Sequence, residues 1–297
     1  MLPLLQRALE IDPDYVPALE WMGSAHHNRS MNGSISSEEL ERLSEQLRRR
    51  ILELDPENVT VITVDAFIAH GANDLEQAAE LFELALSRDA SNSLVVRVAG
   101  SFALDIGDFD TAKRILRHST AIDPLCYQCL YHLSRAQMYA GNLKEAEKTR
   151  ERYMAIGSGG RYWLGLIKLL QEDAAGALAV YEAFPEDEAQ GMAGRAMAHH
   201  DLGETESAEV ALTELLSAKT GQKIRIPEAY AWMGRKDDAF EWLRLIAEED
   251  PNMARFSVFV PVFRNLHDDH RWDGWRESIG MSAERLDAIE FDPDLPE

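Results

Sequence analysis

The amino-acid sequence repeats a pattern at a fixed interval of 34 residues. This interval separates Ala78, Ala112 and Ala146, and it also separates Phe82, Leu116 and Arg150. Between positions 93 and 142, two apolar helical stripes flank an Ile-Gly-Asp-Phe turn, and Asp123-Pro124 ends the second stripe. A period of this length, built from two helices and a short turn, is typical of units that bury their apolar faces only by stacking on neighbours. The sequence therefore predicts an all-α array of helix pairs.

The periodic residues resemble the tetratricopeptide repeat (TPR) family. Small residues such as Gly100 and Ala112 stand where two helices of a TPR touch, larger apolar residues such as Phe82 and Leu116 fill the space between pairs, and Pro124 closes the unit. The resemblance implies a right-handed TPR solenoid of about seven helical pairs with a C-terminal helical cap. It also implies protein binding without catalysis, so we expect no catalytic residue, no cofactor and no metal.

The period also predicts where the segments begin and end. We expect the solenoid over residues 1–252 and the helical cap and tail over 253–297. The solenoid itself divides into a half repeat (1–13), a stretched repeat (14–58), 34-residue repeats (59–157) and shortened repeats at a spacing of 31 residues (158–252). A half repeat presents an apolar face without its partner helix. This favours a chain that continues upstream over a natural cap, and the same face could pair copies of the chain into an oligomer.

The C-terminal end resembles a bacterial family in which such repeats follow a TolB-like segment. The resemblance rests on residues 239–243, 261–266, 270–272 and 279–280. In that family the repeats are often fused to an N-terminal adenylate cyclase or a winged-helix regulator. The resemblance therefore implies that this chain is the C-terminal module of a larger bacterial signalling protein.

The charge of the chain excludes some classes of partner. The formal net charge is −22 and the isoelectric point about 4.8, so the surface repels nucleic-acid phosphates and anionic lipid headgroups. No apolar run approaches the ~20 residues that a membrane-spanning helix needs. We expect a soluble chain that does not insert into a membrane. Its compartment stays open, either the cytoplasm or the periplasmic side of a membrane-anchored protein.

Cys126 and Cys129 form a Cys-x-x-Cys pair at the start of a predicted helix. One such pair cannot hold a structural zinc ion alone, and no second pair with ligand spacing follows. Three alternatives remain: two small buried residues in a repeat interface, a local disulfide in an oxidising compartment, or a redox site whose thiol pKa is lowered by the helix dipole. The stretch 267–270 (His-Asp-Asp-His) has metal-ligand side chains, but it coincides with a turn in the family that the C-terminal end resembles, and this resemblance implies turn chemistry.

The concave surface is the expected binding site, since the first helix of each TPR pair lines it. The residues predicted to point into this groove are Phe67, Arg97, Ser101, Tyr131, Arg135 and Tyr162. Arginine offers two parallel donors to a carboxylate, and aromatic rings supply contact area at low entropic cost. We therefore expect the groove to bind an acidic or C-terminal peptide. The competing interpretation is that Arg97 and Arg135 only pair with acidic neighbours such as Asp105.

Two other functions are compatible with the sequence. One is a regulatory domain that binds a small ligand and controls an upstream adenylate cyclase or transcription regulator, which a closed apolar pocket would favour. The other is an enzyme built on the superhelix, which would need clustered carboxylates or histidines with strongly shifted pKa values.

Overall fold

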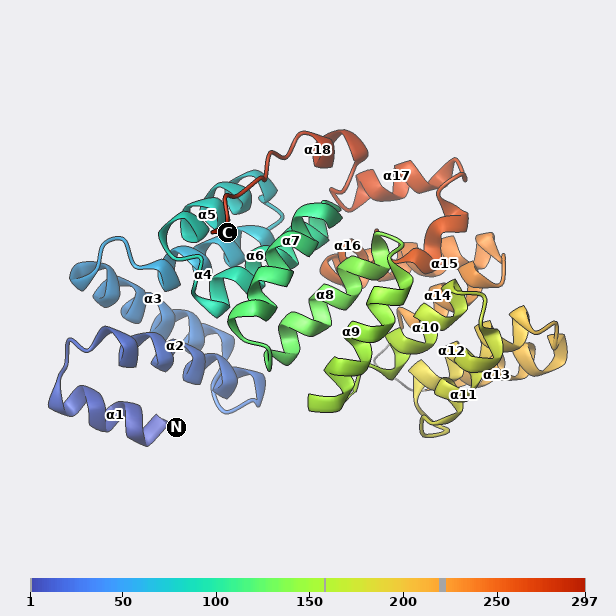
Figure 1. Ribbon diagram of the computed structural model, residues 1–297, viewed down its shortest axis with the longest axis horizontal. Helices are drawn as coiled ribbons and strands as arrows, with labels where there is room; N and C mark the ends of the chain where they lie inside the picture. The colour runs from blue at the N-terminus through green and yellow to red at the C-terminus, as the bar shows by residue number, and fades with distance from the viewer. Residues whose placement is uncertain (1, 158, 219–222, 297) are drawn as a thin grey trace. The chain divides into compact units, whose positions relative to one another are not determined.

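The computed structural model describes residues 2–157, 159–218 and 223–296, and within them the chain is helical and has no strand. The helices of the seven predicted pairs, with the helix that precedes them, are α1 (Leu2–Ile11), α2 (Val16–Met31), α3 (Ser37–Leu54), α4 (Val59–Gly71), α5 (Leu75–Arg88), α6 (Ser93–Ile106), α7 (Phe109–Ile122), α8 (Tyr127–Tyr139), α9 (Leu143–Ile156), α10 (Arg161–Leu170), α11 (Ala174–Glu182), α12 (Ala189–Asp201), α13 (Thr205–Ser217), α14 (Arg225–Trp232) and α15 (Lys236–Glu249). The chain continues with α16 (Pro251–Ser257), the 3-10 helix η1 (Pro261–Leu266), α17 (Arg271–Ser278) and α18 (Ala283–Asp287) (Figure 1). The prediction of an all-α chain of helix pairs is confirmed.

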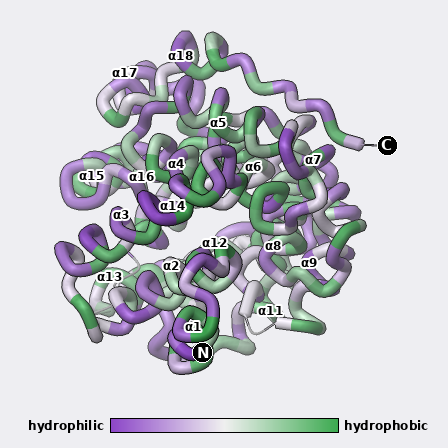
Figure 2. Tube along the Cα trace, turned by 90° about the vertical axis from the view of Figure 1, so that its left-hand side faces the viewer, coloured by the Kyte–Doolittle hydropathy of each residue, from purple (hydrophilic) through white to green (hydrophobic). Residues whose placement is uncertain are grey.

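The chain forms two compact units. Unit 1 comprises the chain up to Val95 together with Pro296, and unit 2 comprises Val96–Leu295. In unit 1, α1 packs on α2, α2 on α3 and α4 on α5. In unit 2, successive helices pair as α8 with α9, α10 with α11, α12 with α13 and α14 with α15. Hydrophobic and hydrophilic residues alternate along these helices, as one-sided burial requires (Figure 2).

The turns between paired helices repeat one backbone feature. A residue with positive φ precedes the second helix of each pair from α4–α5 to α14–α15, at Asn73, Gly107, Gly141, Glu172, Gly203 and Gly234. Their spacing is 34 residues at first and 31 afterwards, as in the sequence period. A side-chain cap often follows this residue. The Asp108 carboxylate accepts a hydrogen bond from the Thr111 amide, and the Asp173 carboxylate accepts one from the Gly176 amide. The turn and the cap together fix where each second helix starts.

Small residues in the first helices allow the large residues of the second helices to fill the core. A Cβ atom added to Gly100 would lie 2.6 Å from the Leu116 side chain. Tyr181 is packed more tightly still, since Cβ atoms on Gly165 and Gly194 would approach its ring to 2.3 Å and 2.1 Å. The alternation of small and large residues that marks the repeat is therefore required by packing.

The segment after α15 packs back onto unit 2. Helix α16 contacts α15, and η1 contacts α14. Its aromatic residues Phe263, Trp272 and Trp275 are buried, and ring contacts link Trp272 with both of the others. The division at residue 252 between solenoid and cap stays a prediction.

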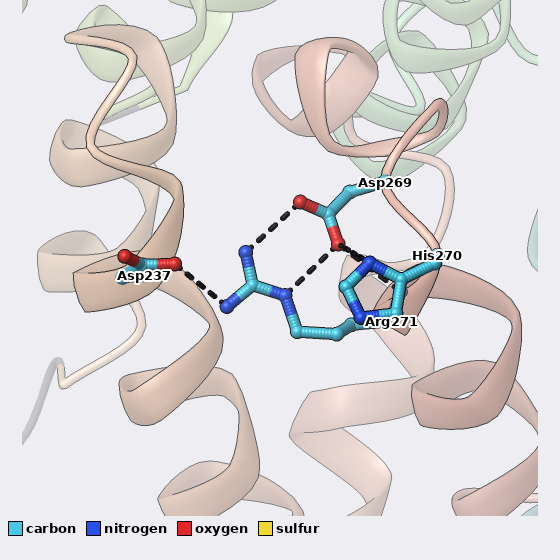
Figure 3. A network of polar contacts seen from close by, with 4 residues as sticks. All are labelled: Asp237, Asp269, His270 and Arg271. Carbon is cyan, nitrogen blue, oxygen red and sulfur yellow. Dashed lines mark hydrogen bonds and ion pairs between the residues drawn. The ribbon is translucent and has the colours of Figure 1, made fainter.

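Arg271 holds the start of α17 in place. Figure 3 shows its guanidinium between two carboxylates, with Nε and Nη2 donating to Asp269 at 2.9 Å each and Nη1 donating to Asp237 of α15 at 2.8 Å. The hydrogen bonds from Arg271 hold the pKa of Asp269 well below its usual range. His267 stacks on Trp272 at 4.6 Å. The His-Asp-Asp-His stretch at 267–270 thus forms a turn, which is the structure expected for it from the sequence.

Candidate peptide-binding site

Four arginines and five aromatic residues of unit 2 form what we call the arginine–aromatic cluster. Its members are Arg97, Arg135, Arg150, Arg225, Tyr131, Tyr139, Tyr153, Tyr162 and Trp163. They come from α6, α8, α9, α10 and α14, so first helices of several pairs contribute together with one second helix. A concentration of arginines is unexpected in a chain with a net charge of −22.

Arg135 lies at the centre of the cluster and is enclosed by rings. Its Cζ atom is 5.3 Å from the Tyr139 ring, 5.5 Å from Trp163 and 5.7 Å from Tyr131. Its Nη2 donates to the Tyr139 hydroxyl at 3.1 Å, and its Nε donates to the same oxygen at 3.3 Å. Electron-rich ring faces attract a guanidinium and fix its plane. The rings therefore hold Arg135 in one orientation.

Arg150 is fully buried, with a relative exposure of 0%. Its Cζ lies 4.9 Å from the Tyr131 ring and 5.1 Å from the Tyr153 ring, and Nη2 donates to the Tyr131 carbonyl at 3.3 Å. Among the described residues, its Nε and Nη1 reach no hydrogen-bond acceptor. Burial lowers the pKa of Arg150 to about 10, which still leaves it charged near neutral pH. A buried charge with unsatisfied donors is costly unless an anion pairs with it.

Two titratable groups next to the arginines are strongly perturbed. Burial raises the pKa of Asp105 to about 7, although Arg135 and a hydrogen bond from Ser101 oppose this rise. Burial lowers the pKa of His132 to about 3, and the positive charges of Arg135, Arg97 and Arg150 add to that effect. Both shifts reduce the charge that these groups carry. The cluster is thus a water-poor, positively charged region.

Arg225 extends the cluster along α14 and is itself neutralised. Its Cζ lies 4.0 Å above the Tyr162 ring and 5.8 Å from Trp163, and its Nη1 pairs with Glu228. The Tyr162 hydroxyl donates to the same carboxylate, which is buried. Trp163 therefore stands between a paired arginine on α14 and Arg135 on α8. Available positive charge is concentrated at the α6–α9 end.

The structure gathers most of the sequence-predicted groove residues in one place. Tyr131 and Arg135 are in direct contact, and Arg97 and Ser101 act electrostatically on the same region. Tyr162 is buried and its hydroxyl is committed to Glu228. Phe67 belongs to unit 1, where it is 60% exposed on α4. The role of these residues in binding stays a prediction.

The sequence pattern predicts four of the nine cluster residues and misses the other five, which are Arg150, Arg225, Tyr139, Tyr153 and Trp163. Arg150 was visible in the period, because it occupies the position that Phe82 and Leu116 fill in other pairs. An arginine at a core position of a repeat is a signal that could have identified it. Trp163 and Arg225 gave no comparable signal, since neighbouring residues on the same helices satisfy the groove pattern equally well.

Cys126 and Cys129 lie beside the cluster at the start of α8 and are bonded as a disulfide in the structure, with Cα atoms 5.3 Å apart. The Ser119 hydroxyl donates to Cys129 Sγ at 3.1 Å, and the Cys129 amide donates to Cys126 Sγ at 3.2 Å. Cys126 stands at the N-cap of α8. Cys129 therefore contacts α7 where it packs on α8, and Cys126 caps the first turn of α8.

Unit 2 also has an open surface cavity of about 750 Å³ at α11–α13, whose lining includes Glu182, Glu186, Asp187, Glu214, Arg195 and Phe184. Arg195 pairs with Glu214 there at 3.8 Å. Among the described residues, no group of three or more His, Cys, Asp or Glu side chains is placed to hold a metal ion. None of the described helices is both long and apolar enough to cross a membrane.

Solved structures show what this arrangement of helices is similar to. The type IV pilus biogenesis factor PilW is 16% identical, with a TM-score of 0.50 over 67% of this chain and 96% of PilW. The human IFIT1 dimer is 14% identical, with a TM-score of 0.50 over 82% of this chain and 67% of that one. A tetratricopeptide repeat protein from Parabacteroides merdae is 13% identical over 79% of this chain and 94% of its own, with a TM-score of 0.49.

The fold is a tetratricopeptide repeat fold. At these low identities the likenesses show the fold alone. No family model and no curated protein sequence matches this chain. The resemblance of its C-terminal end to the TolB-like family stays a prediction.

Proposed function

We propose that this TPR chain is a non-catalytic protein-interaction module that binds an acidic or C-terminal peptide at the arginine–aromatic cluster. The observation that carries the proposal is Arg150, a fully buried arginine whose Nε and Nη1 reach no acceptor among the described residues. A ligand carboxylate at the cluster would supply the missing negative charge. The partly exposed Arg97 and Tyr131 provide the surface through which such a ligand would approach.

The chemistry of the cluster favours a peptide carboxylate over other anions. The aromatic rings around Arg135 offer apolar contact area next to the charge, which suits a side chain beside a carboxylate. Nucleic acid is disfavoured because the chain as a whole carries a net charge of −22. The same charge would repel a strongly acidic protein at long range, so we expect a short acidic segment with few charges outside the contact.

The test is a selection from a library of peptides with free C-termini, against the wild-type chain and against Arg97→Ala/Arg135→Ala. We expect the wild type to enrich peptides with Asp, Glu or a terminal carboxylate. Hydrogen bonds to charged groups contribute about 1.5–3 kcal/mol each. The double variant should therefore bind the enriched peptides at least about tenfold more weakly, since each 1.4 kcal/mol corresponds to a factor of ten.

A matched control separates the cluster from general charge. Arg88→Ala/Arg244→Ala removes the same two charges from exposed ion pairs with Glu57 and Glu248. This control should bind like the wild type. Amidating the peptide C-terminus shows whether the terminal carboxylate or an acidic side chain is recognised. Equal enrichment of acidic peptides by the wild type and the cluster variant would refute the proposal.

The wider setting follows from the sequence and is part of the proposal. The C-terminal resemblance supports a role as the output or sensor arm of a larger bacterial signalling protein. The small-ligand alternative, the oligomer through the N-terminal half repeat, and the choice between cytoplasm and periplasm all stay predictions. The oxidation state of Cys126 and Cys129 in the isolated protein bears on that last choice, since disulfides persist mainly in oxidising compartments.

A further inference from the structure

The C-terminal segment of the chain lies on unit 2 as an extended peptide. After α18 ends at Asp287, residues 289–295 have no regular secondary structure. Phe291 and Pro293 are buried, while Asp292 and Asp294 between and after them are exposed. Alternating burial is how an extended strand contacts a surface, with every second side chain directed into it. The segment therefore has the geometry of a bound peptide, although it belongs to the same chain.

Its main apolar contact is with α6. The ring of Phe291 meets the ring of Phe102 edge to face, with centroids 5.1 Å apart. Phe102 is 0% exposed and Phe291 is 5% exposed. Edge-to-face packing of two buried rings is a specific arrangement that other apolar side chains reproduce poorly. Phe291 is thus the anchor of the segment.

Its main polar contact is with α7, the partner helix of α6. Arg114 Nη1 donates to the backbone carbonyl of Pro293 at 2.6 Å, and Arg114 Nη2 pairs with the Asp292 carboxylate. One guanidinium therefore holds both the main chain and an acidic side chain of the segment. The combination selects an extended peptide in which an acid directly follows the aromatic anchor.

We propose that the surface of α6 and α7 around Phe102 and Arg114 is a peptide-binding site, which the C-terminal segment occupies in the free protein. Its external ligand is an extended segment of a partner protein with the same chemistry, an aromatic residue followed by an acid. The contacts join residues separated by 178 and 179 positions in the sequence.

The tethered segment would regulate access to this site. A tethered ligand competes with a free one at an effective concentration in the millimolar range for a flexible linker. A partner then binds only when it displaces the segment or outnumbers it, so the segment 289–295 inhibits the chain that carries it. This site is separate from the arginine–aromatic cluster, and the inference does not rest on the function proposed for that cluster.

The experiment uses the 297-residue chain and a labelled peptide with the sequence of residues 288–296, AIEFDPDLP. Binding is followed by fluorescence anisotropy. Phe291→Ala removes the anchor of the tethered segment and leaves Phe102 and Arg114 in place. We expect this variant to bind the peptide at least about tenfold more tightly than the wild type does, because competition by its own segment is weakened.

Four controls define the site. Adding Arg114→Ala to Phe291→Ala should abolish the gain, whereas adding Arg117→Ala, which removes an exposed charge on the same helix that pairs with Glu145, should retain it. A peptide in which Ala replaces the phenylalanine should not bind. The pair Arg97→Ala/Arg135→Ala should leave binding of this peptide unchanged, so failure here and failure at the cluster are distinguishable.

A second measurement covers the case in which Phe291→Ala fails to fold. Hydrogen exchange of residues 289–295 in the wild-type chain should become faster as excess peptide displaces the segment. Dimers of the wild-type chain formed by exchange of C-terminal segments would also support the site, because one copy then supplies the ligand of the other. A folded Phe291→Ala chain that does not bind the peptide would overturn the proposal, and so would unchanged exchange at saturating peptide.

Discussion

Asp105 provides the sharpest test of how the arginine–aromatic cluster handles charge. Burial raises its pKa from 3.8 to about 7, so in the folded chain it keeps its proton at pH values where the unfolded chain loses it. Between pH 3.8 and about 7 the folded state binds more protons than the unfolded state. Stability must then decrease as pH rises through this window. Each pH unit corresponds to 1.36 kcal/mol, so the limiting loss over roughly three units is about 4 kcal/mol.

Asp105→Asn removes this titration while keeping the shape of the neutral carboxyl. The variant should therefore gain stability over the wild type as pH rises, by up to about 4 kcal/mol between pH 4 and pH 8. Urea unfolding followed by circular dichroism at several pH values measures the difference. A titration of the Asp105 side-chain carbon by NMR should give a midpoint near 7 directly.

His132 produces the opposite slope and serves as the mirror control. Burial lowers its pKa from 6.5 to about 3. The unfolded chain therefore binds the extra proton between these values, and the contribution of His132 is present above pH 6.5 and lost on acidification. His132→Gln should become more stable than the wild type as pH falls, whereas Asp105→Asn should become more stable than the wild type as pH rises. In the wild type the two slopes largely cancel between pH 4 and 6.5.

The sign of the Asp105→Asn effect decides the argument. If Asp105 were ionised and stabilised mainly by Arg135, the substitution would destabilise the chain at pH 7 and the gap would widen with pH. The interpretation that desolvation dominates at the cluster would be refuted in either of two cases. In the first, the stability difference between Asp105→Asn and the wild type is constant from pH 4 to 8. In the second, the variant becomes progressively less stable than the wild type as pH rises.

Two further substitutions test the packing. Gly194→Ala places a Cβ atom 2.1 Å from the buried Tyr181 ring, so it should lower the free energy of unfolding in urea by about 1–3 kcal/mol. The control Gly274→Ala, whose Cβ atom meets nothing within 4 Å, should not lower it. Equal effects of the two substitutions would contradict the packing argument. Arg150→Leu replaces a buried cation by an apolar side chain and should raise the free energy of unfolding by about 1–4 kcal/mol. The same substitution should weaken the binding of acidic peptides at the cluster. A lower melting temperature would show that the wild-type contacts of Arg150 outweigh the cost of its desolvation.

The fold was predictable because its local and long-range requirements share one period. Each second helix needs a turn residue with positive φ before it and a small residue facing its large one, and both recur at the repeat spacing. Gly100 and Leu116 show this directly, since the contact between them is the one that the period implies. A repeat protein makes most contacts between neighbours in sequence, so sequence periodicity carries most of the structural information.

The candidate site was predictable only in part. Tyr131 and Arg135 lie one helical turn apart on the first helix of a pair, so the expectation that first helices line the groove predicts both of them. Trp163 and Arg225 come from later helices, and their convergence depends on how successive pairs stack, which spacing alone does not specify. The C-terminal segment is the extreme case. Its contact with Arg114 spans 179 positions, and no local pattern in residues 288–296 indicates the helix on which it lies.

The position of Arg150 links the stability of the fold to its proposed function. The same repeat position holds Phe82, Leu116, Tyr181 and Leu243 in other pairs, and all of these are buried. A leucine at position 150 would satisfy the repeat and would avoid two donors that reach no acceptor among the described residues. Departures from local packing rules concentrate at functional sites, where an interaction outside the isolated chain compensates the cost. The arginine at this core position is therefore the strongest reason to look for an anionic ligand here and not elsewhere along the repeats.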